Sequence, residues 1–284
     1  MHILKGYTKQ EISWMMYDWA NSAHSVIIVT LLPIFFDTVA GYTADSVSSM
    51  STWGYATSIA MLIVALAAPF LGVFGDIRGM RKKLFSFFML LGVAACAGMA
   101  FTPGMDFTSG PVTAGKVASL ILVLYIVSVI GFDASAIYYD AFLTDVTIED
   151  RMDKVSTMGY GLGYIGGSTI PLLIFLIMNL VGVPMLTCLA FVFGLTAVWW
   201  LAFSLPLLKN CEQTSGKPYE KGDVARSIKG VGTTIKEIIA NKPMLIYILS
   251  YFFYIDGVHT VISMATTYGT NLGLDSTGMM LALL

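Results

Sequence analysis

Seven apolar segments, each long enough to cross a lipid bilayer, are the feature that most constrains how this chain folds. A membrane-spanning helix needs about 20 consecutive residues that are mainly apolar. Residues are 56% apolar and only 12% charged, whereas a soluble domain carries about 25% charged residues. The sequence therefore predicts an all-α integral membrane protein. The predicted spans cover residues 13–36, 52–75, 84–102, 117–143, 157–180, 184–206 and 243–268.

An eighth apolar segment begins near Thr277 and runs to Leu284 with no polar tail behind it. We therefore expect the sequence to be a fragment that ends inside a helix. At the other end, residues 1–10 are too short and too polar for a cleaved signal peptide, so we expect the first span itself to direct insertion.

Basic residues are distributed very unevenly between the two sides of the predicted spans. Fifteen of the sixteen Lys and Arg residues fall on one side, and only Lys116 falls on the other. Cytoplasmic loops of membrane proteins carry an excess of Lys and Arg. The sequence therefore predicts that the N-terminus and the long 207–242 connection lie in the cytoplasm.

The 207–242 connection is the only long one between predicted spans, and apolar residues recur in it at helical spacing. Such a pattern beside basic residues is typical of an amphipathic helix on a membrane surface. We expect three parts: a six-helix bundle at 1–208, a linker at 209–242 and the start of a second bundle at 243–284. The apolar positions in the linker are Val224, Ile228, Val231, Ile235 and Ile239.

Ionisable residues occur inside every third predicted span. A charge in the hydrocarbon region is costly, so such residues mark a pathway or a pairing. At about 100° per residue, the polar residues of each of these spans share one face, so the three faces are predicted to line one cavity. The candidate substrate or coupling residues are Asp18, Asn21, His24, Asp133, Asp140, Asp256 and His259.

Plainer interpretations of these residues stay open. Each aspartate can be a helix cap or a tether between helices, and for Asp18 this is as good an interpretation as the cavity. His24 and His259 can equally be hydrogen-bonded packing residues.

Small residues are spaced four apart in the fifth span, at Gly159, Gly163 and Gly167. This spacing lets two helices approach backbone to backbone. We interpret these glycines as helix-packing residues rather than ligand contacts.

The loop between the second and third spans combines Gly72, Asp76 and Gly79 with the basic pair Arg81 and Lys82. With this loop the chain resembles the major facilitator superfamily. The resemblance also rests on the six spans, the cytoplasmic bridge, and the polar residues in spans one, four and seven.

Local motifs resemble one branch of it, the vacuole effluxer-like family, also called unknown major facilitator family 1. They are Trp14-Met-Met-Tyr-Asp18-Trp-Ala-Asn21-Ser, Tyr138-Tyr-Asp140-Ala-Phe-Leu, Gly159-Tyr-Gly-Leu-Gly-Tyr-Ile-Gly-Gly167 and Tyr254-Ile-Asp256-Gly-Val-His259-Thr. The resemblance covers about the first two thirds of such a transporter.

The resemblance implies a major facilitator-type bundle, here the N-terminal six-helix half plus the first one or two helices of the second half. It implies a secondary active transporter that works by alternating access. Gly72, Asp76, Gly79 and Arg81 would then form a conformational latch. The latch carboxylate is favoured at a helix N-terminus or beside an arginine. The fourth span contains no arginine, so we do not expect a drug/proton antiporter.

The expected cargo is an amino acid or similar metabolite, the expected direction is efflux, and proton coupling is a further hypothesis. We expect a monomer in the plasma membrane, or in the vacuolar membrane of a fungus, with lipid around it. We expect no nucleic-acid partner, no cofactor and no metal.

Alternatives are a channel, a non-transporting membrane scaffold or lipid-handling relative, and a membrane-embedded enzyme. We do not expect an enzyme, because Asp133 and Asp140 are about 10 Å apart along one helix and the two histidines inside the spans lack local partners.

Overall fold

The computed structural model describes residues 4–43, 48–218, 223–275 and 278–279, and every regular element in this part of the chain is helical. The elements are α1 (Lys9–Ala40), α2 (Ser49–Gly75), α3 (Arg81–Met99), η1 (Thr102–Gly104), α4 (Pro111–Val146), α5 (Glu149–Leu162), η2 (Gly163–Ser168), α6 (Thr169–Leu180), α7 (Met185–Asn210), α8 (Asp223–Ala240) and α9 (Lys242–Asn271).

Seven helical stretches are long and apolar enough to cross a membrane, and they coincide with the seven predicted spans. The prediction of an all-α, multi-pass membrane protein is thereby confirmed. Most helices extend a few residues beyond the predicted bounds, because capping residues and polar end turns also adopt helical geometry. The start predicted for an eighth span, Thr277, and residues 280–284 lie outside the described residues.

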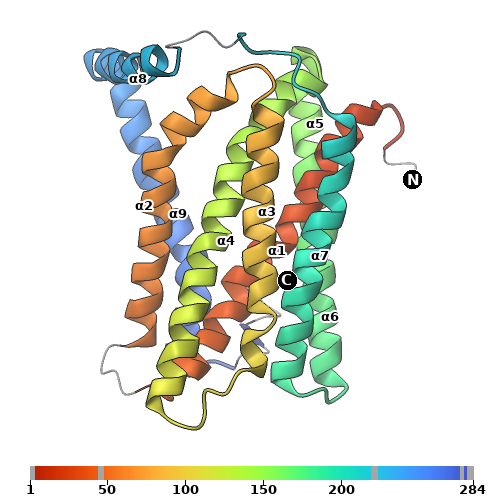
Figure 1. Ribbon diagram of the computed structural model, residues 1–284, viewed down its shortest axis with the longest axis vertical. Coiled ribbons are helices and arrows are strands. Elements are labelled where there is room, and N and C mark those ends of the chain that lie inside the picture. The colour runs from red at the N-terminus through yellow and green to blue at the C-terminus, as the bar shows by residue number, and fades with distance from the viewer. Residues whose placement is uncertain (1–3, 44–47, 219–222, 276–277, 280–284) are drawn as a thin grey trace.

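The spans stand side by side, with α8 lying across the upper ends of α2 and α9 in Figure 1. The N-terminal end of α1, the α2–α3 loop and the α4–α5 connection gather at this same end (Figure 1). Helix α8 contacts both α2 and α9. The basic loops that the sequence predicts to be cytoplasmic thus share one end of the bundle.

A surface helix was predicted within the linker, and α8 occupies that stretch. Ile235 and Ile239 are exposed there, 51% and 60%, which suits a helix that rests on lipid. The side chains of Val224 and Ile228 lie outside the described residues.

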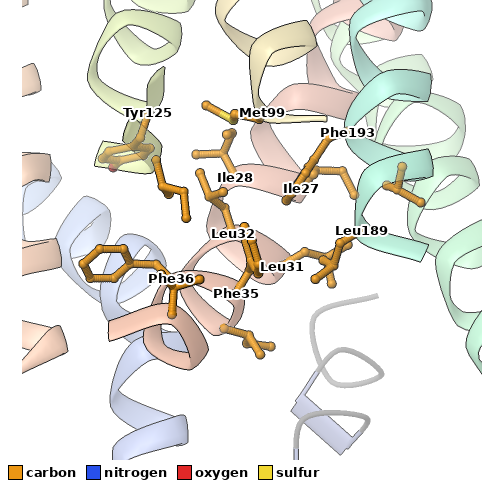
Figure 2. Packing of buried hydrophobic residues seen from close by; sticks show 14 of the residues in the cluster. Ile27, Ile28, Leu31, Leu32, Phe35, Phe36, Met99, Tyr125, Leu189 and Phe193 are labelled. Carbon is orange, nitrogen blue, oxygen red and sulfur yellow. The ribbon is translucent and has the colours of Figure 1, made fainter. Parts of the chain in front are cut away.

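Helix α1 is the centre of the bundle and contacts α2, α4, α5, η2, α6, α7 and α9. Its lower half carries the largest apolar core. Figure 2 shows Ile27 and Leu31 of α1 facing Phe193 and Leu189 of α7, and all four are buried. Since α1 is enclosed on several sides, most of its residues are buried, and several of these are polar.

A buried carboxylate fixes the N-terminal end of α1. Glu11 closes a capping box with Thr8 and accepts two hydrogen bonds from Arg151, at 2.9 Å from Nε and 2.8 Å from Nη2. Thr147 Oγ1 donates to the same carboxylate at 2.7 Å. Bidentate pairing of this kind is strong and directional, so it ties the start of α1 to the end of α4 and the start of α5.

The fifth span has a π-helical turn, η2, between α5 and α6. Its glycines lie against α1. A Cβ atom on Gly163 would lie 2.6 Å from Ser22 Oγ, and one on Gly167 would lie 2.5 Å from the Trp19 carbonyl oxygen. Only glycine fits such an approach, and the wider π turn accommodates it.

Helices α2 and α9 lie at the edge of the bundle, with long apolar faces exposed, including Leu66 at 65% and Phe253 at 70%. Only the C-terminal part of α9 is buried, where Thr266 Oγ1 donates to the Val29 carbonyl of α1 at 2.8 Å. In a membrane these exposed faces meet lipid or another part of the protein.

Replacing Gly167 by alanine should destabilise the bundle by about 1–3 kcal/mol, because the added methyl group meets main-chain atoms of α1 that cannot move independently. The measurement is the thermal unfolding midpoint in detergent, followed by tryptophan fluorescence.

Gly161→Ala is the matched control, since a Cβ there would meet nothing within 4 Å. That variant should unfold at or above the original midpoint. Equal midpoints for the two variants would contradict the close packing of η2 on α1.

Candidate functional site

A polar cavity of about 710 Å³ lies between α1, α4 and the α5–η2–α6 span, with Ile262 of α9 at its edge. This volume is in the range of pockets that bind small molecules. The cavity is only partly enclosed, because Tyr160 and Tyr164 in its lining are 64% and 59% exposed. Its polar side chains lie among otherwise apolar spans, so they are the first candidates for function.

Helix α1 supplies one polar stripe to this cavity. Asp18, Asn21, Ser22 and Ser25 all line it, as their helical spacing requires. Asp18 packs closely against α5, because a Cβ atom on Gly159 would lie 2.6 Å from Asp18 Oδ2. The absent side chain of Gly159 therefore leaves the room that the Asp18 carboxylate occupies.

Helix α4 contributes Tyr139 and Asp140 to the lining. The ring of Tyr139 stacks on Trp14 with 4.3 Å between ring centroids, and Trp14 Nε1 donates to the Tyr139 carbonyl at 2.9 Å. The ring of Tyr139 is therefore firmly held at the cavity wall, with its buried hydroxyl beside the Asp18 carboxylate.

The third wall comes from the fifth span, through Tyr160 of α5 and Tyr164 of η2. Their hydroxyls are 3.1 Å apart and their rings meet edge to face at 4.9 Å. The sequence analysis assigned only helix packing to this span and did not identify the two tyrosines as site residues. The sequence feature that could have indicated them is their spacing, four residues apart on one helix face beside the glycines.

His24 and Asp133 are near this region but do not line the cavity. His24 is 2% exposed and its ring lies 5.1 Å from that of Phe132 and 4.9 Å from that of Trp200. Neither His24 nitrogen nor Asp133 Oδ2 has a hydrogen-bond partner in the described part of the chain. The structure thus places both side chains behind the cavity wall, among packed aromatic residues in the case of His24.

Asp256 and His259 of α9 are exposed and are not in the cavity lining. Of the predicted polar face of α9, Thr260 and Ser263 instead border a second cavity of about 400 Å³ between α2 and α9. Helix α9 packs on α1 mainly near Thr266, so its N-terminal half stands away from the main cavity. The structure therefore does not bring the three predicted polar faces together.

Within the described residues, no group of three or more His, Cys, Asp or Glu side chains is placed to hold a metal ion.

The loop between α2 and α3 forms the second candidate site. Gly79 has φ +80°, a left-handed conformation that favours glycine. Asp76 is the C-cap of α2, and its side chain is exposed. Asp76 thus lies at the end of the second span, as predicted, whereas Arg81 turns inward and is buried.

Arg81 forms an ion pair with Asp145 of α4 and is only 5% exposed. Its Nη1 also donates to the Ala141 carbonyl at 2.9 Å and to Ser215 Oγ at 3.2 Å. Asp145 was not among the predicted site residues. Asp145 lies at the very end of α4. An acidic residue at the end of a predicted span is common, so the sequence does not indicate its pairing with Arg81.

A segment after α7, residues 211–217, crosses this loop and is here called the strap. Gln213 Oε1 accepts from the main-chain N of Gly79 at 2.8 Å and of Arg81 at 3.2 Å, and its Nε2 donates to the Gly75 carbonyl at 3.1 Å. Asp145 accepts from Thr214 and Ser215 at 2.8–3.1 Å. The strap therefore fastens the α2–α3 loop to the end of α4.

Main-chain bonds complete this attachment. Lys217 N donates to the Asp76 carbonyl at 3.1 Å, and Arg78 N donates to the Lys217 carbonyl at 3.0 Å. Gly216 has φ +111°, and a Cβ on it would lie 2.8 Å from the Asp76 carbonyl oxygen. The strap lies this close only because residue 216 is glycine.

Comparison with known proteins places these features in a family. The model of the family described as "Vacuole effluxer Atg22 like" matches residues 41–284. The uncharacterized MFS-type transporter YxiO of Bacillus subtilis (strain 168) is 39% identical over 289 residues, which cover 99% of this chain. The chain belongs to the Atg22-like family.

Two fungal proteins named Autophagy-related protein 22-1 are more distant relatives. The Penicillium rubens protein is 27% identical over 136 residues, covering 44% of this chain and 23% of its own length. The Sclerotinia sclerotiorum protein is 26% identical over 131 residues, covering 40% and 22%. The alignment with YxiO covers 65% of that protein, so this Atg22-like chain spans slightly less than two thirds of its length.

The family match confirms the resemblance inferred from the motifs, and with it the major facilitator-type helix bundle. The name of the Bacillus relative is that of a transporter, which agrees with the expectation that this Atg22-like chain is not an enzyme.

Cys211 at the start of the strap gives a test of how firmly the strap is held. Its side chain is fully buried, and burial raises the pKa of the Cys211 thiol to about 12. The thiolate is the reactive form, so it is scarce at pH 7–9. In a Cys96→Ala, Cys188→Ala background, alkylation by N-ethylmaleimide should be slow and should rise about tenfold per pH unit without levelling off near 8.5, the usual cysteine pKa.

Gly216→Ala should displace the strap and raise the alkylation rate at pH 7.5 about tenfold, because it exposes the thiol. Lys217→Ala is the control, since only the main chain of Lys217 forms hydrogen bonds with the loop. A rate that levels off near pH 9 in the parent, or no difference between the two variants, would show that the strap does not cover Cys211.

Proposed function

We propose that this protein is a secondary active transporter that moves a small solute across the membrane by alternating access. The observation that carries the proposal is the 710 Å³ cavity between otherwise apolar spans, with Asp18 and Asp140 among its lining residues. Membership of the Atg22-like family and the transporter name of the Bacillus relative support it.

The proposed cargo is an amino acid or a similar metabolite, and the proposed direction is efflux. The description of the family as vacuole effluxers supports this direction. Proton coupling is part of the proposal, because carboxylates inside the spans can bind and release a proton during the cycle.

We further propose that residues 1–208 act as one bundle, residues 209–242 as a linker and residues 243–284 as the start of a second bundle. The N-terminus is proposed to be cytoplasmic, because the basic loops share the end of the bundle that carries it. The plasma membrane is the proposed location, or the vacuolar membrane in a fungus, and the protein is proposed to act as a monomer.

Transport is tested with the protein at its native length in proteoliposomes, by counterflow of labelled amino acids with labelled sugars as a control. Counterflow of an amino acid is expected, because a carrier exchanges its cargo faster than it moves empty. Asp18→Asn and Asp140→Asn should each lower the rate at least about tenfold, since each removes a charge from the cavity.

Asp106→Asn is the matched control, because Asp106 lies in an exposed loop between η1 and α4. Asp256→Asn tests the predicted role of α9. We propose that Asp256 joins the site in a conformation in which further parts of the protein surround α9. Counterflow of no amino acid, or equal rates in all four variants, would contradict the proposed cargo or the proposed site.

The α2–α3 loop is proposed to act as the conformational latch, with Gly72 and Gly79 shaping the loop and Arg81 holding it to α4. Among the described residues, the Asp76 carboxylate has no ion-pair partner, so it is available to a part of the protein that moves against this end of the bundle. Asp76→Asn should lower the counterflow rate about tenfold while expression and thermal midpoint stay unchanged.

Asp153→Asn, which alters another exposed aspartate at the same end, controls for the loss of one surface charge. Normal transport in Asp76→Asn would end the latch proposal.

A further inference from the structure

The main cavity is lined by acidic and aromatic side chains without a basic counterpart. Asp18 and Asp140 both line it, and none of the described residues in its lining is Lys, Arg or His. The two ion pairs in the described part of the chain, Arg81–Asp145 and Arg151–Glu11, involve neither carboxylate. The negative potential of these carboxylates is therefore not offset by a basic side chain among the described residues that line the cavity.

Aromatic rings occupy the walls between and opposite these carboxylates. Tyr139 and Phe132 come from α4, and Tyr160 and Tyr164 from the fifth span. The faces of such rings carry partial negative charge and attract cations, most strongly where water is excluded. Carboxylates and ring faces thus favour the same kind of ligand group.

The Tyr139 side chain belongs to the same polar arrangement as Asp18. Tyr139 is only 4% exposed, and its ring is held between Trp14 at 4.3 Å and Tyr17 at 4.8 Å between centroids. Its buried hydroxyl lies beside the Asp18 carboxylate. A ligand ammonium that pairs with Asp18 would therefore lie next to this hydroxyl, whose oxygen can accept a hydrogen bond.

An anionic ligand fits this cavity poorly. It would meet two carboxylates, and the hydroxyl and amide donors from Asn21, Ser22, Ser168 and Thr169 carry no net charge to offset the repulsion. A zwitterion would gain from its ammonium and lose from its carboxylate. The balance of groups favours a ligand with a net positive charge.

We propose that the solute bound in this cavity is, within the proposed range of amino acids and similar metabolites, one with a net positive charge. Its ammonium group lies between Asp18, Asp140 and Tyr139, and its apolar or aromatic body lies against Tyr160 and Tyr164. This inference rests on the proposed function, since it names the charge class of the cargo that the same cavity would hold.

Three probes of one shape and different charge test the proposal. Tyramine is a cation at pH 7.5, tyrosol replaces its amine by a hydroxyl, and 4-hydroxyphenylacetate is an anion. Binding of each to the purified, native-length protein in detergent is measured by titration calorimetry. Tyramine should bind at least about tenfold more tightly than either of the others, because only its ammonium pairs with the carboxylates.

Asp18→Asn and Asp140→Asn should each reduce this preference about tenfold while leaving the weak binding of tyrosol unchanged, because amide and carboxylate have the same shape. Tyr139→Phe should weaken the binding of tyramine about threefold, because one hydrogen bond to the ligand is lost. Asp106→Asn, in the exposed loop, should change none of the three affinities.

Tyrosol or 4-hydroxyphenylacetate binding as tightly as tyramine would overturn the cation proposal and leave the cavity as a solute site. No binding of tyramine at millimolar concentration would overturn it as well. A preference for tyramine that persists in both aspartate variants would show that the cation binds elsewhere. If a neutral amino acid shows counterflow together with any of these results, the proposed transport function stands and only the proposed positive charge of the solute is wrong.

Discussion

The close approach of α1 to the glycines of the fifth span is the contact on which the cavity depends. Gly159 leaves room for the Asp18 carboxylate, and Gly163 and Gly167 let η2 meet the main chain of α1. The helices approach closely here, and Tyr160 and Tyr164, which alternate with these glycines, line the cavity beside the contact. The π turn follows from the same contact, because the extra residue per turn relieves the crowding and sets Tyr164 at the cavity wall.

The charges of the chain divide into two groups with different physical roles. At the end of the bundle that bears the N-terminus, Glu11 pairs with Arg151 and Asp145 with Arg81, so these buried charges are compensated and fix the ends of helices. Within the spans, Asp18 and Asp140 have no such partner. An uncompensated carboxylate among apolar helices costs stability, and the proposed binding of a cation in the cavity would offset that cost.

Sequence alone predicted those parts of the structure that follow from local periodicity and from the bilayer. The seven spans follow from hydropathy, and the stripe Asp18, Asn21 and Ser22 from helical spacing. The π turn, the position of α9 and the strap depend on contacts between segments far apart in the chain. Gln213, for example, bonds to main-chain atoms more than 130 residues away, and nothing near it in the sequence predicts those partners.

The cavity and the α2–α3 loop share helix α4, and this gives a physical link between them. Asp140 lines the cavity, and Asp145, five residues further on, anchors Arg81 and the strap. Five residues of an α-helix span about 7.5 Å, so both groups belong to the last turns of one rigid element. Because both groups lie at the same end of one helix, α4 is the element through which binding in the cavity and the attachment of the strap would be coupled.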